Sequence, residues 1–287
     1  MKTLLRGWVV GLLFFWSVPV YSATIFNFAN FNNCSTLQLN GNAACTGGVL
    51  RVTPAAFSQS GSTFSTTLIP LGAGASFSTY FSFRMSASGF GGADGIVFVI
   101  QPVASTVGGG GGGIGYVGIP NSLGVEFDTW DNGVGSGDPD GNHVGIDLNG
   151  SVASVQTAPV SSPLDDGSIW YAWIDYDGSV LELRLSQTNV RPVSPILSRA
   201  VALSSVLGTS SAYVGFTSGT GAAYSNHDIL TWRFDNSFAP IGGAAPPPTL
   251  SAAPIPTLSD LALGLLALLI AGCAVYRLRR PTELENN

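Results

Sequence analysis

The sequence predicts an all-β fold, built as an antiparallel β-sandwich, and two observations support this prediction. Short runs rich in Val, Ile, Phe, Thr and Tyr recur between clusters of Gly, Asn, Asp and Ser, while helical periodicity is hard to find in residues 24–240. The segment "IWYAWIDYDGSVLELRL" also contains Asp177-Gly178, a pair that supplies the positive-φ turn between two antiparallel strands. The roughly 220 residues involved fit one sandwich domain.

Each candidate strand is a β-branched or aromatic run that ends at a turn-forming cluster. Successive side chains on a strand point to opposite faces, as expected for Trp173 and Ile174, so each run can bury one face in a core. The predicted strands are Thr24–Phe31, Val49–Thr53, Ser76–Met85, Gly95–Gln101, Ser122–Trp130, His143–Leu148, Ile169–Tyr176, Ser179–Ser186, Ala212–Ser218 and Ile229–Asp235.

Residues 1–22 have the layout of a secretory signal peptide. Lys2 and Arg6 precede an apolar run from Trp8 to Val18, and a small-residue exit follows before Ala23. The run is shorter than the ~20 residues of a membrane-spanning helix, which favours cleavage over an N-terminal membrane anchor. The mature chain is therefore expected to begin near Ala23.

A second apolar run, Leu261–Tyr276, is predicted to be a transmembrane helix. Arg277, Arg279 and Arg280 follow it, and positive charge after a span favours a cytoplasmic end. The preceding residues 239–254 are rich in Pro and Ala and almost uncharged, which is typical of an extended linker. The segment between the two apolar runs is then expected outside the cytoplasm.

Charge and cysteine content narrow the possible function classes. From Thr24 to Leu250 there are fourteen Asp and Glu residues against six Arg, and Lys2 is the only lysine of the chain. Nucleic-acid binding needs a basic surface, so no nucleic-acid partner is expected. Cys34 and Cys45 are the two cysteines outside the tail, and in an oxidising compartment we expect a disulfide that contributes roughly 3 kcal/mol.

The stretch "GVEFDTWDNGVGSGDPDGNHVGIDLNG" (124–150) is predicted to bind metal ions. It holds six carboxylates without one basic residue, and like charges at this density repel unless a cation gathers them. Glu126 and Asp128 lie two apart on a predicted strand and so share a face, and the Gly-rich loop after them can bring Asn132 and Asp138 back to them.

The types of donor in this stretch indicate two different ions. Oxygen ligands in such number suit Ca²⁺, whereas His143 adds an imidazole that Mn²⁺ or Zn²⁺ accepts. We therefore expect two adjacent ions that share Asp128 and Asp138, namely Ca²⁺ and a transition metal, Mn²⁺ or Zn²⁺. The alternative for such a stretch is an acidic solvated loop without an ion.

Four motifs, in order, resemble those of the L-type lectins, the legume seed lectins and their secretory-pathway relatives. "ADGIVFVI" (93–100) resembles the strand of their sugar loop, and "GIGYVGI" (113–119) their glycine loop. "VEFDTW" through "HVGIDLN" resembles their metal loop, and "AYVGFTSGTGAAYSNHDILTWRF" (212–234) their closing strands with the specificity loop. The resemblance spans nearly the whole region between the two apolar runs and implies a jelly-roll sandwich of the concanavalin type.

The resemblance also implies which residues hold each metal ion. Those that match the transition-metal ligands are Glu126, Asp128, Asp138 and His143. Those that match the calcium ligands are Asp128, Trp130 through its carbonyl, Asn132 and Asp138.

By the same resemblance, the groups that hydrogen-bond sugar hydroxyls are Asp94, Asn132 and a backbone amide near Gly115, with Ala222 in the specificity loop. The Trp130 ring fills the place of the aromatic ring under the sugar, and a carboxylate, an amide and a ring together satisfy both the hydroxyls and the apolar face of a monosaccharide. The Ala93–Asp94 peptide bond is expected to be cis.

Two further segments of the site region leave alternatives open. The glycine run Val107–Gly113 lies between two strong predicted strands and is either a flexible loop or a backbone-lined wall of the site. His227 and Tyr224 lie in the specificity loop, where His227 is equally compatible with a role in binding and with a structural hydrogen bond.

Ile255-Pro256-Thr257-Leu258, followed by the apolar helix and the Arg cluster, resembles the IPTL variant of the PEP-CTERM sorting tails of Gram-negative bacteria. In such proteins a membrane transpeptidase of the exosortase type is thought to cut near the motif. The resemblance implies a protein held in the inner membrane before sorting and then passed to the cell surface or extracellular matrix. A simple single-span anchor is the alternative.

The predicted organisation is a signal peptide at 1–22, a lectin sandwich at 23–238, a linker at 239–254, a sorting signal with its helix at 255–280 and a short tail at 281–287. The predicted function is non-enzymatic, metal-dependent binding of a glycan or exopolysaccharide, with an exosortase-type enzyme as the processing partner.

Two functions of other classes compete with this prediction. A laminarinase-type β-glucan hydrolase shares the sandwich, and Glu126-x-Asp128-x-x-Asp131 nearly matches its Glu-x-Asp-x-x-Glu strand, but this hypothesis leaves the amide, the histidine and the other carboxylates of the stretch without a role. The second alternative is an adhesive or structural surface protein that its metal ions only stiffen.

Overall fold

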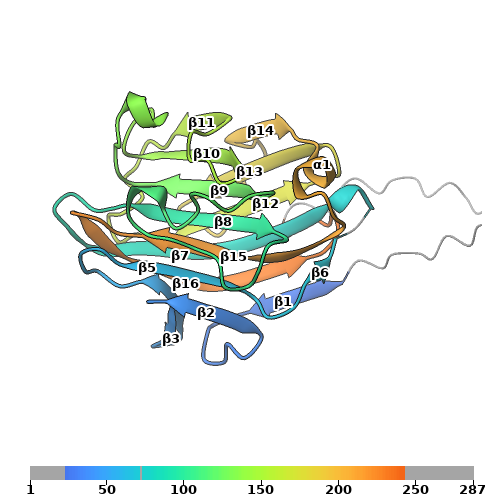
Figure 1. Cartoon of the computed structure of the whole chain (residues 1–287), viewed down its shortest axis with the longest axis horizontal. Coiled ribbons are helices and arrows are strands. Elements are labelled where there is room, and N and C mark those ends of the chain that lie inside the picture. Colours follow the sequence, from blue (N-terminus) through green and yellow to red (C-terminus); the bar gives the residue numbers. More distant parts are fainter. Residues whose placement is uncertain (1–22, 72, 243–287) are drawn as a thin grey trace, which may run out of the picture. The chain divides into compact units, whose positions relative to one another are not determined.

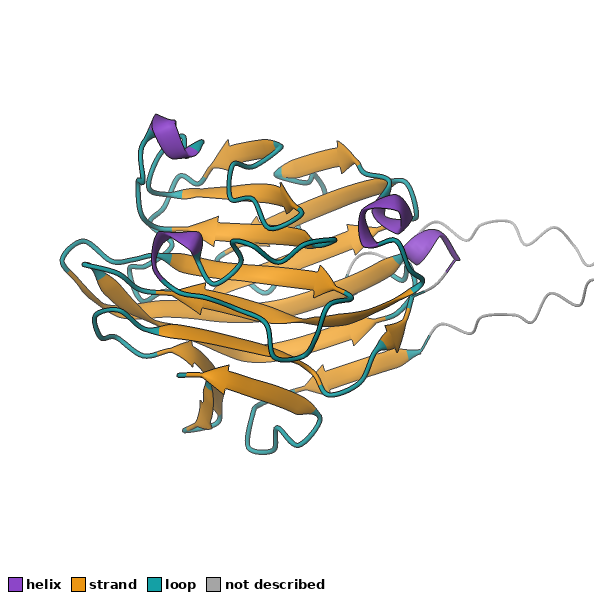
Figure 2. Cartoon of the chain, viewed as in Figure 1, coloured by secondary structure: helices purple, strands orange, loops and turns teal. Residues whose placement is uncertain are grey.

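Two antiparallel β-sheets pack face to face in the computed structural model, which describes residues 23–71 and 73–242 (Figure 1). Each sheet has eight strands. Helix in this part of the chain is limited to α1 (Leu203–Leu207) and three short 3-10 segments, η1 (Ala73–Ala75), η2 (Gly111–Gly113) and η3 (Val134–Ser136) (Figure 2). The predicted antiparallel sandwich is therefore confirmed.

The first sheet has the strand order β14-β13-β12-β7-β16-β4-β3, with β1 also paired to β16. The predicted hairpin is present in it, because the strands on either side of Asp177-Gly178 pair with Tyr176 opposite Leu181. The strands are β1 (Thr24–Phe28), β3 (Ala44–Thr46), β4 (Val49–Thr53), β7 (Phe77–Gly89), β12 (Trp170–Tyr176), β13 (Val180–Ser186), β14 (Leu197–Ala200) and β16 (Tyr224–Asp235).

The second sheet has the order β11-β10-β9-β8-β15-β5-β2, with β6 also paired to β15. Its strands are β2 (Leu37–Gly41), β5 (Ser60–Ser65), β6 (Ile69–Pro70), β8 (Gly95–Gln101), β9 (Leu123–Asp128), β10 (His143–Leu148), β11 (Gln156–Pro159) and β15 (Ser211–Gly219). All ten predicted strands have a counterpart in the two sheets, whereas β2, β3, β5, β6, β11 and β14 were not predicted.

The core between the sheets is rich in aromatic rings, including Phe81, Phe98 and Phe216, all fully buried. β8 is buried on both faces, because the segment after it folds back over the outside of its sheet. There, Val97 and Val99 of β8 pack with side chains of that covering segment, Ile114, Tyr116 and Ile119. The glycine run is therefore held by a small apolar cluster of its own on the outer face of the sheet.

The strand register brings several loops to one end of the sandwich. β9 ends at Asp128, opposite Gly95 where β8 begins, and Gly95 also pairs with Gly219, where β15 ends. In the other sheet, β16 begins at Tyr224, opposite Gly89 where β7 ends. The loops 90–94, 129–142 and 220–223 thus lie at the same end.

Cys34 and Cys45 form the predicted disulfide, with their Cα atoms 6.6 Å apart. Within residues 23–71 and 73–242, no helix has both the length and the apolar character needed to cross a membrane. The chain divides into two units, Met1–Gly243 and Ala244–Asn287. The predicted signal peptide, sorting motif and C-terminal helix lie outside the described residues.

Candidate functional site

Strands β9 and β10 present their polar residues on the outer face of the second sheet. Val125 and Phe127 enter the core, so Glu126 and Asp128 point the other way, as the two-residue period predicts. β10 pairs with β9 and places His143 directly opposite Asp128. This register gathers ligand-type side chains from two neighbouring strands.

Glu126, Asp128 and His143 form a buried cluster in which one ligand atom from each residue lies within 4.8 Å of the others. His143 Nε2 lies 3.3 Å from Glu126 Oε1, and Nδ1 lies 2.7 Å from the carbonyl oxygen of Asp140. A carbonyl oxygen can only accept, so Nδ1 carries a proton and Nε2 faces the carboxylates. Metal-ligating histidines commonly have this arrangement, in which the far nitrogen donates to a fixed acceptor.

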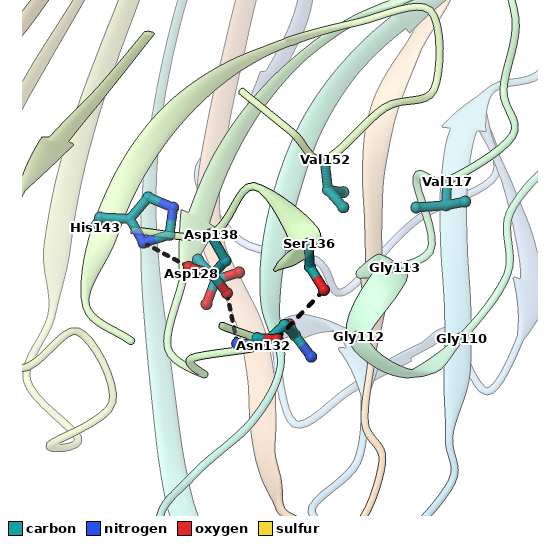
Figure 3. A pocket seen from close by; sticks show the side chains of 10 residues that line it. All are labelled: Gly110, Gly112, Gly113, Val117, Asp128, Asn132, Ser136, Asp138, His143 and Val152. Atoms are coloured by element: carbon teal, nitrogen blue, oxygen red, sulfur yellow. Dashed lines mark hydrogen bonds and ion pairs between the residues drawn. The ribbon is translucent and has the colours of Figure 1, made fainter. Parts of the chain in front are cut away.

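The loop 129–142 folds back over this cluster, so that Asp138 and Asn132 lie beside it (Figure 3). Asp138 Oδ2 accepts the Asn132 backbone N–H at 2.7 Å, and Asp138 Oδ1 lies 3.7 Å from His143 Nδ1. Asp128 Oδ1 accepts the Trp130 backbone N–H at 2.6 Å. The carboxylates expected to be shared by two ions therefore also fix the loop that carries Asn132.

Burial and neighbouring charges shift the pKa values of the residues in this cluster. Burial raises the pKa of Asp128 to about 8, and the nearby charges of Glu126 and Asp138 add to this shift. Burial opposes the charged form of His143, but its hydrogen bond to Glu126 and the adjacent carboxylates outweigh that effect and raise its pKa to about 9. Carboxylates that are buried together beside one imidazole, with no lysine or arginine in the segment 124–150, could hold a metal ion.

Asp147 and Ser154 also belong to the cluster and were not assigned from the sequence. The Ser154 hydroxyl oxygen lies 2.7 Å from Glu126 Oε1 and 2.6 Å from Asp147 Oδ1. Burial raises the pKa of Asp147 well above its usual value, with the Glu126 charge as the next cause. The signal for Asp147 was in the strand period, because residues 143, 145 and 147 share one face.

Asp94 follows a cis peptide bond from Ala93, as expected. Its backbone N–H donates to the Gly219 carbonyl at 3.0 Å, and its own carbonyl accepts the Thr129 N–H at 3.1 Å. The side-chain oxygen Oδ2 is buried and has no hydrogen-bond partner among the described residues. Burial raises the pKa of this carboxyl to about 6. A buried carboxylate with a free acceptor oxygen is suited to a ligand hydroxyl.

A cavity of about 340 Å³ separates the metal loop from the glycine run. Gly110, Gly112 and Gly113 line one wall, with Asn132 among the residues across from them (Figure 3). A Cβ added to Gly112 would lie 2.6 Å from Asn132 Nδ2, so the bare backbone approaches that amide closely. The glycine run thus forms a backbone-lined wall, and the part facing the cavity does not include Gly115, which is buried against Thr217 and Ser218 of β15.

The Trp130 ring packs at the edge of the site. A Cβ on Gly91 would lie 3.4 Å from Trp130 Cζ3, so the ring contacts the turn that leads to Asp94. Ala222 is exposed in the turn between β15 and β16, and a Cβ on its neighbour Gly221 would lie 3.7 Å from Asp94 Oδ2. Asp94, Trp130 and Ala222 therefore border the same end of the sandwich.

Two other polar residues of the sequence analysis have environments that separate them from this cluster. His227 is fully buried, its Nδ1 lies 2.7 Å from Thr53 Oγ1, and burial lowers its pKa to about 3. This is the environment of a structural histidine. Asp131, the second acid of the hydrolase alternative, is exposed and accepts the Gly133 N–H at 2.7 Å.

Comparison with known families gives two matches. A family model described as the legume lectin domain matches residues 23–246, and one described as the IPTL-CTERM motif matches residues 253–280. The L-type lectin-domain containing receptor kinase VIII.1 of Arabidopsis thaliana is 37% identical over 217 residues, which cover 70% of this chain and 28% of the kinase. Receptor kinase II.1 of the same plant is 30% identical, over 96% of this chain and 48% of that protein. The chain thus spans less than half the length of these curated relatives.

Solved lectin structures match the sandwich over most of their length. The lectin from Bauhinia forficata in complex with GalNAc is 25% identical with a TM-score of 0.66, covering 75% of this chain and 98% of that one. Basic winged bean lectin with Tn-antigen is 31% identical with a TM-score of 0.63, covering 77% and 100%. The metal-free I-B4 lectin from Griffonia simplicifolia is 29% identical with a TM-score of 0.64, covering 73% and 97%. These matches point to a carbohydrate-binding protein rather than an enzyme.

Proposed function

We propose that this chain, which belongs to the legume lectin family, binds carbohydrate in a metal-dependent manner. Family membership supports carbohydrate binding in general. The observation that carries the metal dependence is the buried cluster of Glu126, Asp128 and His143, whose ligand atoms lie within 4.8 Å of one another. The segment 124–150 holds six carboxylates and no lysine or arginine, and its one imidazole cannot balance them all, so cations are the natural counter-charge.

The proposed ligands divide by donor type. A transition metal, with Mn²⁺ as the first candidate, is assigned to Glu126, Asp128, Asp138 and His143. Calcium is assigned to the oxygens of Asp128, Asp138 and Asn132 and to the Trp130 carbonyl. Bound ions would tie the loop 129–142 to the sheet, and this supports a role for both ions in holding Asn132 in place.

The proposed sugar site uses Asp94 and Asn132 as hydrogen-bonding side chains, with Trp130 and Ala222 at its edge. The free Oδ2 of Asp94 supports its role as an acceptor. For the backbone amide, Gly112 and Gly113 replace Gly115 in our proposal, because they line the cavity beside Asn132. Galactose and N-acetylgalactosamine are the first sugars to test, since solved neighbours are complexes with GalNAc and with galactose.

A glycan array tests this function directly. The full-length protein, loaded with Ca²⁺ and Mn²⁺, is expected to bind a subset of glycans, to lose binding in EDTA and to regain it when both ions are restored. Binding that persists in excess chelator contradicts metal dependence. A metal-loaded protein that binds no glycan but adheres to cells would support the adhesive alternative, and release of reducing ends from a β-glucan would support the hydrolase.

The IPTL-CTERM match supports export and surface association, and we propose that the chain is held in the inner membrane of a Gram-negative bacterium until an exosortase-type enzyme cuts its tail. Replacement of Pro256 and Thr257 should then leave uncut protein in the inner-membrane fraction. Mass spectrometry of wild-type protein from its own host checks this proposal, because an intact C-terminus there would indicate a plain anchor.

A further inference from the structure

Three aromatic side chains, two of them exposed and the third, Tyr224, half-buried, form a cluster beside the proposed sugar site. The ring centroids of Phe57 and Phe90 lie 5.3 Å apart, those of Phe57 and Tyr224 4.9 Å, and those of Phe90 and Tyr224 6.0 Å. Phe57 is 50% exposed and Phe90 is 71% exposed. Rings gathered at the surface gain little from the hydrophobic core, so their grouping calls for another reason.

The backbone conformation of Phe90 is also unfavourable for a large side chain. Its φ is +59°, in the left-handed region that bulky residues rarely adopt and that glycine adopts without cost. The fold therefore keeps a large apolar side chain where both its solvent exposure and its backbone conformation are unfavourable. Residues that break local rules in this way concentrate at functional sites.

The loop that carries Phe57 is fixed despite its exposure. Within it, the Ser58 N–H donates to the Gly221 carbonyl at 3.1 Å, and the Ala55 N–H donates to Asn226 Oδ1 at 2.8 Å. Thr220 Oγ1 donates to the Ala56 carbonyl at 2.6 Å. The backbone on both sides of Phe57 is thus fixed before any ligand arrives, which reduces the entropy that the loop loses on binding.

The same contacts place the cluster next to the sugar site. Phe90 lies four residues before Asp94 in one loop, and Tyr224 pairs with Gly89 at the start of that loop. The residue after Phe57, Ser58, donates its N–H to the carbonyl of Gly221, and a Cβ added to Gly221 would lie 3.7 Å from Asp94 Oδ2.

We propose that Phe57, Phe90 and Tyr224 form an aromatic platform for a second sugar unit of the glycan whose terminal sugar occupies the Asp94–Asn132 site. This proposal rests on the proposed function. The apolar C–H face of a pyranose stacks on such rings. The carboxylates of Asp94 and of Asp165, which contacts Gly92, would repel an anionic ligand, so we assign a neutral oligosaccharide to the platform.

The test compares two ligands of the same sugar by calorimetry on the full-length protein with Ca²⁺ and Mn²⁺. Methyl glycosides of galactose, N-acetylgalactosamine, glucose, mannose and fucose identify the terminal sugar, and a neutral tetrasaccharide ending in that sugar is the longer probe. Phe57→Ala and Phe90→Gly should each weaken tetrasaccharide binding roughly tenfold while changing methyl glycoside binding less than about twofold. Phe90→Gly should also keep or raise the melting temperature, because glycine relieves the left-handed backbone.

Phe238→Ala is the matched control. Phe238 is 49% exposed, like Phe57, but lies just beyond the other end of β16, and its loss should change neither affinity. Three results would overturn the platform. They are an unchanged tetrasaccharide affinity in the platform variants, an equal loss of affinity for the tetrasaccharide and the methyl glycoside, and a change in oligomeric state measured by sedimentation. Failure of the proposed function is distinguishable, because wild-type protein would then bind none of the probes, and the platform would fall with it.

Discussion

Asp94 and Asp128 are both buried aspartates at one end of the sandwich, but their surroundings differ. Asp128 faces His143 and other carboxylates, and its Oδ1 is engaged by the Trp130 backbone. Asp94 is set apart from this cluster, and its Oδ2 has no partner among the described residues. These surroundings support our proposal that Asp128 holds an ion and that Asp94 accepts a hydrogen bond from a ligand hydroxyl.

Substitution should separate these two roles. Asp94→Ala is expected to lower glycan affinity on the order of a hundredfold, as expected for loss of a charge-assisted hydrogen bond, with bound metal unchanged. Asp128→Ala is expected to lose metal and glycan binding together. Elemental analysis and calorimetry on the same samples measure both quantities, and metal loss in Asp94→Ala would contradict the assignment.

The raised pKa of Asp94 predicts a pH dependence. As pH falls through about 6, the buried carboxyl takes up a proton, and glycan affinity should fall because the charged acceptor is lost. The contribution of this group to folding stability changes in the opposite direction. A raised acid pKa means that the folded state binds the proton more tightly, so this contribution is present below the usual pKa and disappears as pH rises through about 6.

Asp94→Asn is the control for this prediction. The amide does not titrate, so the variant should lose the part of the pH dependence of unfolding that lies between the usual pKa and about 6. Denaturant titrations at several pH values measure it, with metal content followed in parallel because protons also compete for the metal ligands. An unchanged profile in Asp94→Asn would assign the titration to another group.

At the scale of elements, the glycine run is positioned by its neighbours. Ile114 and Tyr116 are fully buried, and Thr217 Oγ1 donates to the Ile114 carbonyl at 2.9 Å, which anchors the segment on the outer face of β8 and β15. The preceding glycines can then approach Asn132 without a side chain in between.

Two substitutions within this run should differ in effect. At Gly112 a methyl group would lie 2.6 Å from Asn132 Nδ2 and so displace that amide, whereas at Gly109 no atom lies within 4 Å of the added carbon. We therefore expect Gly112→Ala to weaken glycan binding roughly tenfold and Gly109→Ala to leave it unchanged. Calorimetry on both variants is the measurement, and equal affinities would show that the close approach has no part in binding.

The elements found from the sequence are those with strong side-chain patterns. β8, β9 and β10 combine β-branched, aromatic and alternating polar residues. β5 reads "SGSTFS" and was missed, because its small polar residues are buried only by tertiary contacts. The predicted end of β9 was two residues too long, since the Asp128 side chain binds the Trp130 N–H and draws the chain out of the sheet.

In the candidate site, too, some residues could be predicted from local sequence patterns and others could not. Alternation alone placed Glu126 and Asp128 on one face, and the resemblance supplied Asp94. The approach of Gly112 to Asn132 depends on how two long loops fold against each other, and no local periodicity carries that information. Ser154 was missed for a similar reason, because it reaches Glu126 from outside any strand.

For the whole molecule, the proposed ion binding beside the loop 129–142 would link the conformation of that loop to global stability. Ions that bind the folded state and not the unfolded one stabilise it by mass action, by about 2.7 kcal/mol at a hundredfold excess over Kd. The buried carboxylates of β9 and β10, which repel one another, are the groups that would benefit: Glu126, Asp128 and Asp147.

Loading with Ca²⁺ and Mn²⁺ should therefore raise the melting temperature by roughly 5–10 °C for a domain of this size, and EDTA should reverse the rise. Scanning calorimetry measures the shift, and Asp128→Ala serves as the control that should not respond. A melting temperature independent of both metal and chelator would indicate that the acidic loop holds no ion.

The path of the chain through the sandwich has a practical consequence. β16 begins beside the loops at Tyr224 and ends at Asp235, which pairs with Thr24 at the start of β1, so the described chain enters and leaves at the end opposite those loops (Figure 1). Coupling the protein to a sensor chip or bead through either terminus of this domain leaves the loop end facing the solution. An immobilised domain should consequently bind large glycan polymers as readily as small sugars, because a polymer does not have to reach the surface to which the domain is attached.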